Sequence, residues 1–147
     1  MNLRVFYLYQ INDFCLDLYQ QYPYRLYRIL KDTYYTSKYH QQYAISSYEQ
    51  VTNKFNRQFL HDFVKWHYKL DLYYHYKNST HTISSNREYS NLLVSSYSLK
   101  IKSNLSYPSF FDSINDYNDS IFVCDFDNQD YFWLSKVIHK GKNVVKE

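Results

Sequence analysis

The chain has 147 residues, of which 45% are hydrophobic and 21% are charged, and its formal net charge is +3. This length and balance are typical of one soluble globular domain. No run approaches the roughly eighteen apolar residues of a membrane span, and the first eleven residues lack the apolar core of a signal peptide. We therefore expect a cytoplasmic protein without a membrane segment.

Cysteine and tyrosine usage narrows the class of protein further. Cys15 and Cys124 are too few for a disulfide framework, so buried thiols in a reducing compartment are expected. The 20 tyrosines stand against a single glycine, a balance that drift toward A/T-rich codons produces without functional pressure. A tyrosine-rich face that stacks on single-stranded nucleic acid is the alternative. Basic residues are spread along the chain, however, so the sequence does not indicate direct nucleic-acid binding.

The first third of the chain predicts a strand and two helices. Alternating apolar residues predict a strand over Arg4 to Ile11, and Asn12 is a good N-cap for a helix directly after it. Pro23 ends this first helix and can begin a second one, expected over about Pro23 to Lys31. The polar, tyrosine-rich segment from Lys31 to Ile45 is expected to be a connection.

Two further helical segments are expected before the main sheet. Ser46 or Ser47 caps the first, which carries Tyr48, Val51 and Phe55. The second covers about Arg57 to Lys69, and its apolar residues have the spacing of one buried face. The sequence leaves open whether the two segments form one continuous helix.

From residue 70 onward the apolar residues recur at every second position, and no longer at every fourth. Strands are expected over Leu70 to Tyr76, His81 to Ser85 and Leu92 to Ile101, with a turn at residues 86–88. Pro108 opens a short helix that reaches about Asp116.

The most hydrophobic segment, Ile121 to Leu134, predicts a β-hairpin. Two aromatic-rich runs flank the polar tetrad Asp127 to Asp130, and Asn and Asp tolerate the backbone angles of tight turns. A polar basic tail follows over about residues 136–147. Together the elements predict a single α/β (α+β) domain over residues 1–147, with a mixed, mostly antiparallel sheet packed with helices and a C-terminal β-hairpin.

The sequence contains no pattern that indicates catalysis. The six histidines form no ligand-spaced pair on one helical turn, and the motifs of zinc sites, phosphate-binding loops and nucleophile elbows are absent. Asp125, Asp127 and Asp130 resemble an acidic metal-binding loop, but the glycine and the distal glutamate of a calcium loop are missing. We therefore predict a protein that is not an enzyme and that uses no cofactor and no metal.

The first helix is the candidate site that remains. It presents two apolar stripes, one with Phe14 and Leu18 and one with Cys15. Because Cys15 is small and permits close approach, its stripe can face the sheet, which leaves Phe14 and Leu18 outward between Asp17 and Gln21. Such an exposed pair is typical of a patch that binds a partner. The alternative, that both stripes belong to the core, stays open at this point.

Several segments in the same order resemble one family, the sporulation inhibitor of replication proteins (SirA). They are FYLYQI followed by NDF, RILKDTYYTS running into HQQYA, and CDFDNQDYFWL followed by the short basic tail. The resemblance implies a small cytoplasmic, non-enzymatic protein that binds the N-terminal domain of the replication initiator DnaA and prevents new rounds of initiation. It also implies contact through the N-terminal helical region. On this basis Phe14, Leu18 or Tyr19 (depending on the alignment), Tyr48 and Val51 are expected to bind the partner. The patch on the first helix adds Asp17 and Gln21, so the expected partner-binding residues are Phe14, Asp17, Leu18, Gln21, Tyr48 and Val51. A single-stranded nucleic-acid-binding protein that uses surface tyrosines and the basic tail is the alternative function.

Overall fold

A computed structural model describes residues 2–138 of the chain. In this part of the chain the strands and helices are β1 (Arg4–Gln10), α1 (Asp13–Tyr19), α2 (Pro23–Thr36), α3 (Gln41–Val51), α4 (Arg57–His67), β2 (Tyr74–Lys77), β3 (Thr80–Ser84), β4 (Tyr89–Val94), β5 (Leu99–Ser103), α5 (Phe110–Tyr117), β6 (Ile121–Asp125) and β7 (Asp130–Trp133). Residues 134–138 are also helical. No helix among the described residues is long and apolar enough to cross a membrane.

The strands form one seven-stranded sheet in the order β2-β3-β4-β5-β1-β6-β7, and each neighbouring pair is antiparallel. The first strand of the chain, β1, therefore lies inside the sheet, between β5 and β6. This arrangement confirms the predicted α+β class, the antiparallel sheet and the C-terminal hairpin.

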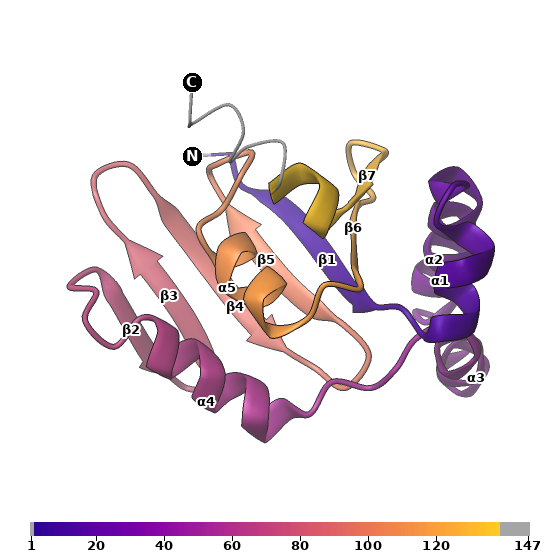
Figure 1. The fold of residues 1–147 in the computed structure, drawn as a ribbon, viewed down its shortest axis with the longest axis horizontal. Coiled ribbons are helices and arrows are strands. Elements are labelled where there is room, and N and C mark those ends of the chain that lie inside the picture. The colour runs from indigo at the N-terminus through magenta and orange to yellow at the C-terminus, as the bar shows by residue number, and fades with distance from the viewer. Residues whose placement is uncertain (1, 139–147) are drawn as a thin grey trace.

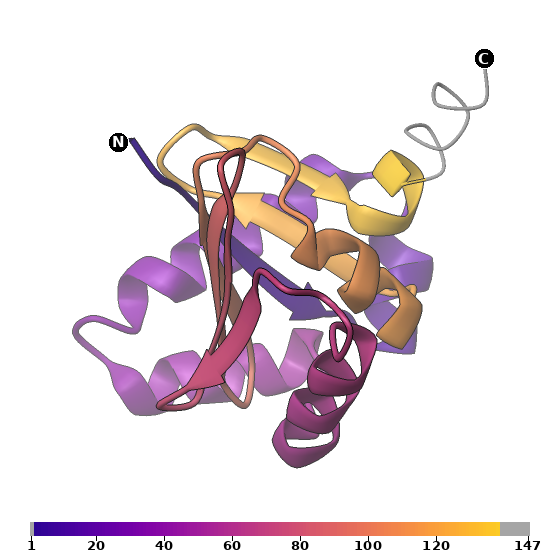
Figure 2. The ribbon, with the colours of Figure 1, turned by 90° about the vertical axis from the view of Figure 1, so that its left-hand side faces the viewer.

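Helices pack on both faces of the sheet, as expected from the alternation in β1. Phe6 and Leu8 point into one core cluster with residues of α4 and α5, which we call the α4 face. Tyr9 points into a second cluster with residues of α1, α2 and α3, which we call the α1 face. Figure 1 shows α4 and α5 in front of the strands, with α1 to α3 gathered beside the β6 side of the sheet. In Figure 2, α4 and α5 lie nearer the viewer and to the right of the strands, with the purple helices of the other group behind the strands and reaching out to the left.

The helix α2 is longer than the sequence predicts, and the expected connection from Lys31 to Ile45 is wrong. The buried stripe of α2 continues past Lys31 to Thr33, whose hydroxyl donates to the Ile29 carbonyl at 2.8 Å. Tyr34 then stacks on Phe126 with ring centroids 4.7 Å apart. Tertiary packing of the stripe therefore outweighs the polar, tyrosine-rich composition of this segment.

The predicted cap at Ser46 or Ser47 is also wrong, because α3 already begins at Gln41. Ser47 lies inside the helix, and its hydroxyl lies 2.8 Å from the Thr33 hydroxyl of α2. Phe55 lies beyond the end of α3 and packs on the α4 face, whereas Val51 packs on the α1 face. The chain thus crosses from one face of the sheet to the other between α3 and α4, which are separate helices.

The expected single strand from Leu92 to Ile101 is two strands, β4 and β5. The Ser95 amide donates to the Ser98 carbonyl at 3.0 Å and closes the turn between them. The alternation appeared continuous because this turn is short. The strand expected over Leu70 to Tyr76 begins later than predicted. The observed strand β2 starts at Tyr74, and Leu72 before it is 94% exposed. Residues 136–138 of the predicted tail are helical, and residues 139–147 lie outside the described part of the chain.

Candidate functional site

The seven-residue helix α1 is fixed at its beginning by Asn12. The Oδ1 atom of Asn12 accepts a hydrogen bond from the Cys15 amide at 2.9 Å, so the predicted N-cap is confirmed. The Nδ2 atom of Asn12 donates to the Gln50 carbonyl at 2.9 Å, and its backbone amide donates to the Val51 carbonyl at 3.0 Å. These bonds attach α1 to the end of α3, so a helix too short to be stable alone has a fixed orientation.

The structure settles which stripe of α1 faces outward. Cys15 is 5% exposed and belongs to the core cluster of the α1 face. Phe14 is 75% exposed and Leu18 is 49% exposed. Asp17 and Gln21 are exposed beside them. The interpretation that Cys15 turns inward and Phe14 and Leu18 turn outward is therefore confirmed, and the alternative of two core stripes is wrong.

The exposed residues of α1 continue into a groove of about 460 Å³ that borders α2. Its lining consists of Leu18, Tyr19, Tyr22, Tyr24, Arg25, Arg28 and Ile29. The Arg25 guanidinium lies 5.0 Å from the centroid of the Tyr22 ring, and the Arg28 Nη1 donates to the Tyr24 hydroxyl at 3.2 Å. Tyr24, Arg25 and Arg28 are not among the site residues predicted from the sequence, although the four-residue spacing of Tyr24 and Arg28 is visible there. We call Phe14, Asp17, Leu18, Gln21 and these groove residues the α1–α2 surface.

Tyr48 and Val51, the other two expected partner-binding residues, lie elsewhere. Val51 is 7% exposed and packs in the core cluster under α1. The Tyr48 ring is half-buried and stacks between the rings of Tyr9 and Tyr97, with centroids 5.8 Å and 5.7 Å away. Burial raises the pKa of the Tyr48 hydroxyl. The structure therefore brings together Phe14, Asp17, Leu18 and Gln21, and it places Val51 under α1 and Tyr48 apart from them, between β1 and the β4–β5 turn.

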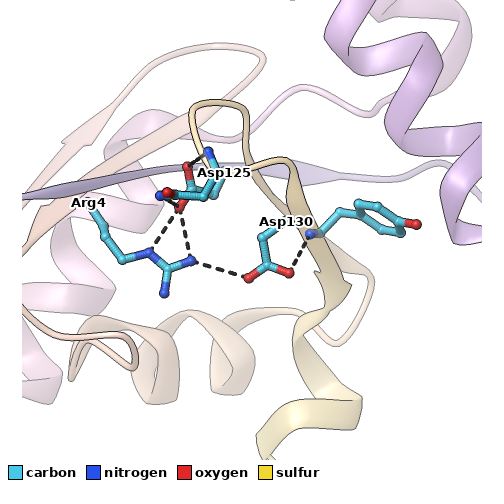
Figure 3. A network of polar contacts seen from close by, with 5 residues as sticks. Arg4, Asp125 and Asp130 are labelled. Carbon is cyan, nitrogen blue, oxygen red and sulfur yellow. Dashed lines mark hydrogen bonds and ion pairs between the residues drawn. The ribbon is translucent and has the colours of Figure 1, made fainter.

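Two acidic residues of the C-terminal hairpin connect the hairpin to β1. Asp125 is buried and accepts hydrogen bonds from the Arg4 Nε at 3.0 Å and from the Asn128 Nδ2 at 2.7 Å. The Arg4 Nη2 also lies 3.2 Å from an oxygen of Asp130 (Figure 3). Arg4 thus ties β1 to both strands of the hairpin. Within residues 2–138 no group of three or more His, Cys, Asp or Glu side chains is placed to hold a metal ion.

The structure brings together one polar pair that the sequence spacing did not reveal. The Nδ1 atom of His61 on α4 lies 2.8 Å from the Nε2 atom of His81 on β3. Twenty residues separate them in the sequence, so no helical-turn spacing connects them. His81 is fully buried on the α4 face, which makes this pair a contact inside the fold.

The fold and this site define a single-domain α+β protein with an exposed apolar helix surface on a rigidly attached short helix. The family model described as "Sporulation inhibitor of replication protein SirA" matches residues 4–138. The chain therefore belongs to the SirA family, which is a family of regulatory replication inhibitors and not a known enzyme family. No curated protein matches the chain.

Proposed function

We propose that this protein inhibits the initiation of replication by binding the N-terminal domain of DnaA with its α1–α2 surface. The observation that carries the proposal is the 75% exposure of Phe14 on a helix whose opposite side is packed. A large exposed apolar side chain costs solvation free energy in the isolated protein, and a partner that covers it recovers that free energy. Inhibitors of this kind act by occupying the domain through which initiators meet their regulators and one another.

The chemistry around Phe14 supports a protein partner. Leu18 extends the apolar centre, and Asp17, Gln21 and Arg25 surround it with polar groups. A central apolar anchor inside a polar rim is the usual anatomy of protein interfaces. The tyrosines of the groove add amphipathic rings, which are enriched at such interfaces.

Tyr48 and Val51 have a supporting role in this proposal. The Val51 carbonyl accepts the Asn12 amide, and the Val51 side chain packs in the cluster that contains Cys15. Changes at these two positions are expected to weaken binding through the position of α1, together with a loss of stability. Changes at Phe14 are expected to weaken binding without a loss of stability.

A calorimetric titration of the full chain with the isolated N-terminal domain of the host's DnaA tests the proposal. Truncation of a central apolar anchor typically costs at least about 2 kcal/mol, so we expect Phe14→Ala to weaken binding by about thirtyfold or more. Phe59→Ala is the matched control, because Phe59 on α4 is 55% exposed and lies on the other side of the sheet. Equal affinities for the wild type and Phe14→Ala would remove the α1–α2 surface from the interface.

A further inference from the structure

No helix among residues 2–138 covers one half of the α1 face. The core cluster under α1, α2 and α3 takes its strand residues from β1, β6 and β7, and it contains none from β2 to β5. Several residues of β2 to β5 on this side are solvent-accessible: Lys77 is exposed, Tyr89 is 37% exposed and Leu93 is 39% exposed, whereas Lys100 and Lys102 are half-buried and Thr82 is buried. Figures 1 and 2 show α1 to α3 placed toward the β6 side of the sheet, away from β2 and β3.

The strand register gathers lysines on this open half. Lys77 pairs with Thr80, Thr80 with Leu93, and Leu93 with Lys100, so these residues form one row across four strands. Lys102 is two residues beyond Lys100 and points to the same side. Strand spacing places the Cα atoms of Lys77 and Lys100 about 14 Å apart, and those of Lys100 and Lys102 about 7 Å apart.

The charged side chains of the strands on this open half have one sign, and Glu49 of α3, which accepts from the Tyr97 hydroxyl at 2.8 Å, lies at its corner. The strands β2 to β5 contain three lysines and no aspartate or glutamate, so no acidic strand residue neutralises the row. The lysines are far apart in the sequence and become neighbours only through the register. For this reason the sequence alone did not indicate a basic surface.

The open half ends at a corner with α2 and α3 that is rich in tyrosine rings and hydroxyl groups. A hollow of about 380 Å³ at this corner is lined by Tyr7, Tyr9, Tyr34, Ser37, Gln41, Ala44, Ile45, Tyr48 and Ser95–Ser98. Two lysines flank it: the Lys100 Nζ lies 5.7 Å from the Tyr7 ring centroid, and the Lys38 Nζ lies 5.3 Å from that of Tyr34.

We propose that the open half of the α1 face, with Lys77, Lys100 and Lys102, binds single-stranded nucleic acid. Lysines provide the sequence-independent attraction to phosphates. The half-buried rings of Tyr7, Tyr34 and Tyr97 at the corner provide the aromatic surface on which unpaired bases stack. A duplex would use the lysines, but it keeps its bases away from the rings of the corner. This surface uses none of Phe14, Leu18 or α1, so it is separate from the proposed DnaA contact.

Fluorescence anisotropy of a labelled oligothymidine of about 20 nucleotides, long enough for one binding site, tests the inference with the full chain. Each phosphate contact on a single strand contributes about 0.7 to the slope of log affinity against log salt, so Lys100→Gln/Lys102→Gln should lower that slope by about 1.4. We also expect the affinity at low salt to fall about tenfold or more. Lys65→Gln/Lys69→Gln is the matched control, since it removes the same charge near α4, on the other side of the sheet.

Three outcomes would overturn the inference. The first is the absence of oligothymidine binding by the wild type at low salt. The second is an equal loss of oligothymidine affinity in the two double variants, which would mean that only the net charge of the protein matters. The third is equally tight binding of polyglutamate or of a duplex of the same length, which would assign the surface to an acidic protein or to double-stranded DNA. Phe14→Ala is expected to leave oligothymidine binding unchanged, so the two surfaces are tested separately.

Discussion

The His61 Nδ1 atom lies 2.8 Å from the His81 Nε2 atom and joins α4 to β3. The other ring nitrogen of His81 lies 2.7 Å from the Tyr74 hydroxyl. Burial and the neighbouring His61 and Lys65 lower the pKa of His81 to about 3, and burial also lowers the pKa of His61. Both histidines are therefore neutral at pH 7, and α4 rests on an uncharged pair.

This pair makes the folded protein sensitive to mild acid. The unfolded chain binds a proton at each histidine near the usual pKa of about 6.5, whereas the folded chain does not. Stability is therefore fully present above about pH 6.5 and falls as the pH decreases toward the folded pKa values. For His81 the loss approaches about 1.4 kcal/mol per pH unit below pH 6. Urea unfolding at a series of pH values from 7.5 to about 5 measures this loss of stability.

The variant His81→Gln separates this effect from general acid sensitivity. It should lower stability at pH 7.5, because a buried hydrogen-bonded ring is lost. It should also flatten the dependence of stability on pH between 7.5 and 5. A slope as steep as that of the wild type would assign the acid sensitivity to other groups.

The Arg4–Asp125 pair predicts a second effect on stability. Removing the guanidinium leaves a buried carboxylate without its charged partner, although Asn128 still donates to it. Loss of one partner of a buried pair costs several kcal/mol; since the Arg4 side chain is 29% exposed, we expect about 2 kcal/mol for Arg4→Met. The double variant Arg4→Met/Asp125→Asn should recover part of this loss in urea unfolding.

Asp130→Asn is the control for this prediction. The Asp130 side chain is 51% exposed, so its contact with Arg4 is screened by water and should contribute less than about 1 kcal/mol. Equal losses for Arg4→Met and Asp130→Asn would contradict the assignment of Asp125 as the principal partner of Arg4.

The two-residue turn between β2 and β3 predicts a stabilising substitution. Asn78 and Ser79 have φ angles of 53° and 60°, a region that asparagine tolerates and that serine occupies at a cost. Ser79→Gly should raise the free energy of unfolding by about 0.5–1 kcal/mol, because glycine relieves the strain. Ser84→Gly in β3 should lower it by a similar amount, since glycine weakens a strand. A lower free energy of unfolding for Ser79→Gly than for the wild type would contradict the inference that Ser79 is strained.

Local sequence signals predicted the parts of the fold that depend on neighbouring residues. The Asn12 cap, the start of α2 at Pro23 and the two runs that flank the hairpin tetrad each placed an element correctly. The end of α1 was predicted less well, because α1 stops at Tyr19 and not at Pro23. The errors occurred where distant contacts decide the structure. The helix α2 extends to Thr33 and beyond because Thr33 contacts Ser47 of α3. The turn between Ser95 and Ser98 becomes evident only from the pairing of Val94 with Leu99 across β4 and β5.

The candidate site was predictable to a similar extent. The helical spacing separated Phe14 and Leu18 from Cys15, and the small size of Cys15 indicated the buried stripe correctly. The groove residues Tyr24 and Arg28 were not assigned, because they border α1 only after the chain turns at Pro23. The lysine row was also hidden, since its residues come from β2 and β5.

Binding of the wild-type protein to three forms of DnaA tests the central claim most directly. The forms are the full-length initiator, its isolated N-terminal domain and the initiator without that domain. We expect similar dissociation constants for the first two and no binding to the third. Equal binding to the truncated initiator, or no binding to the isolated domain, would contradict the proposed mode of inhibition.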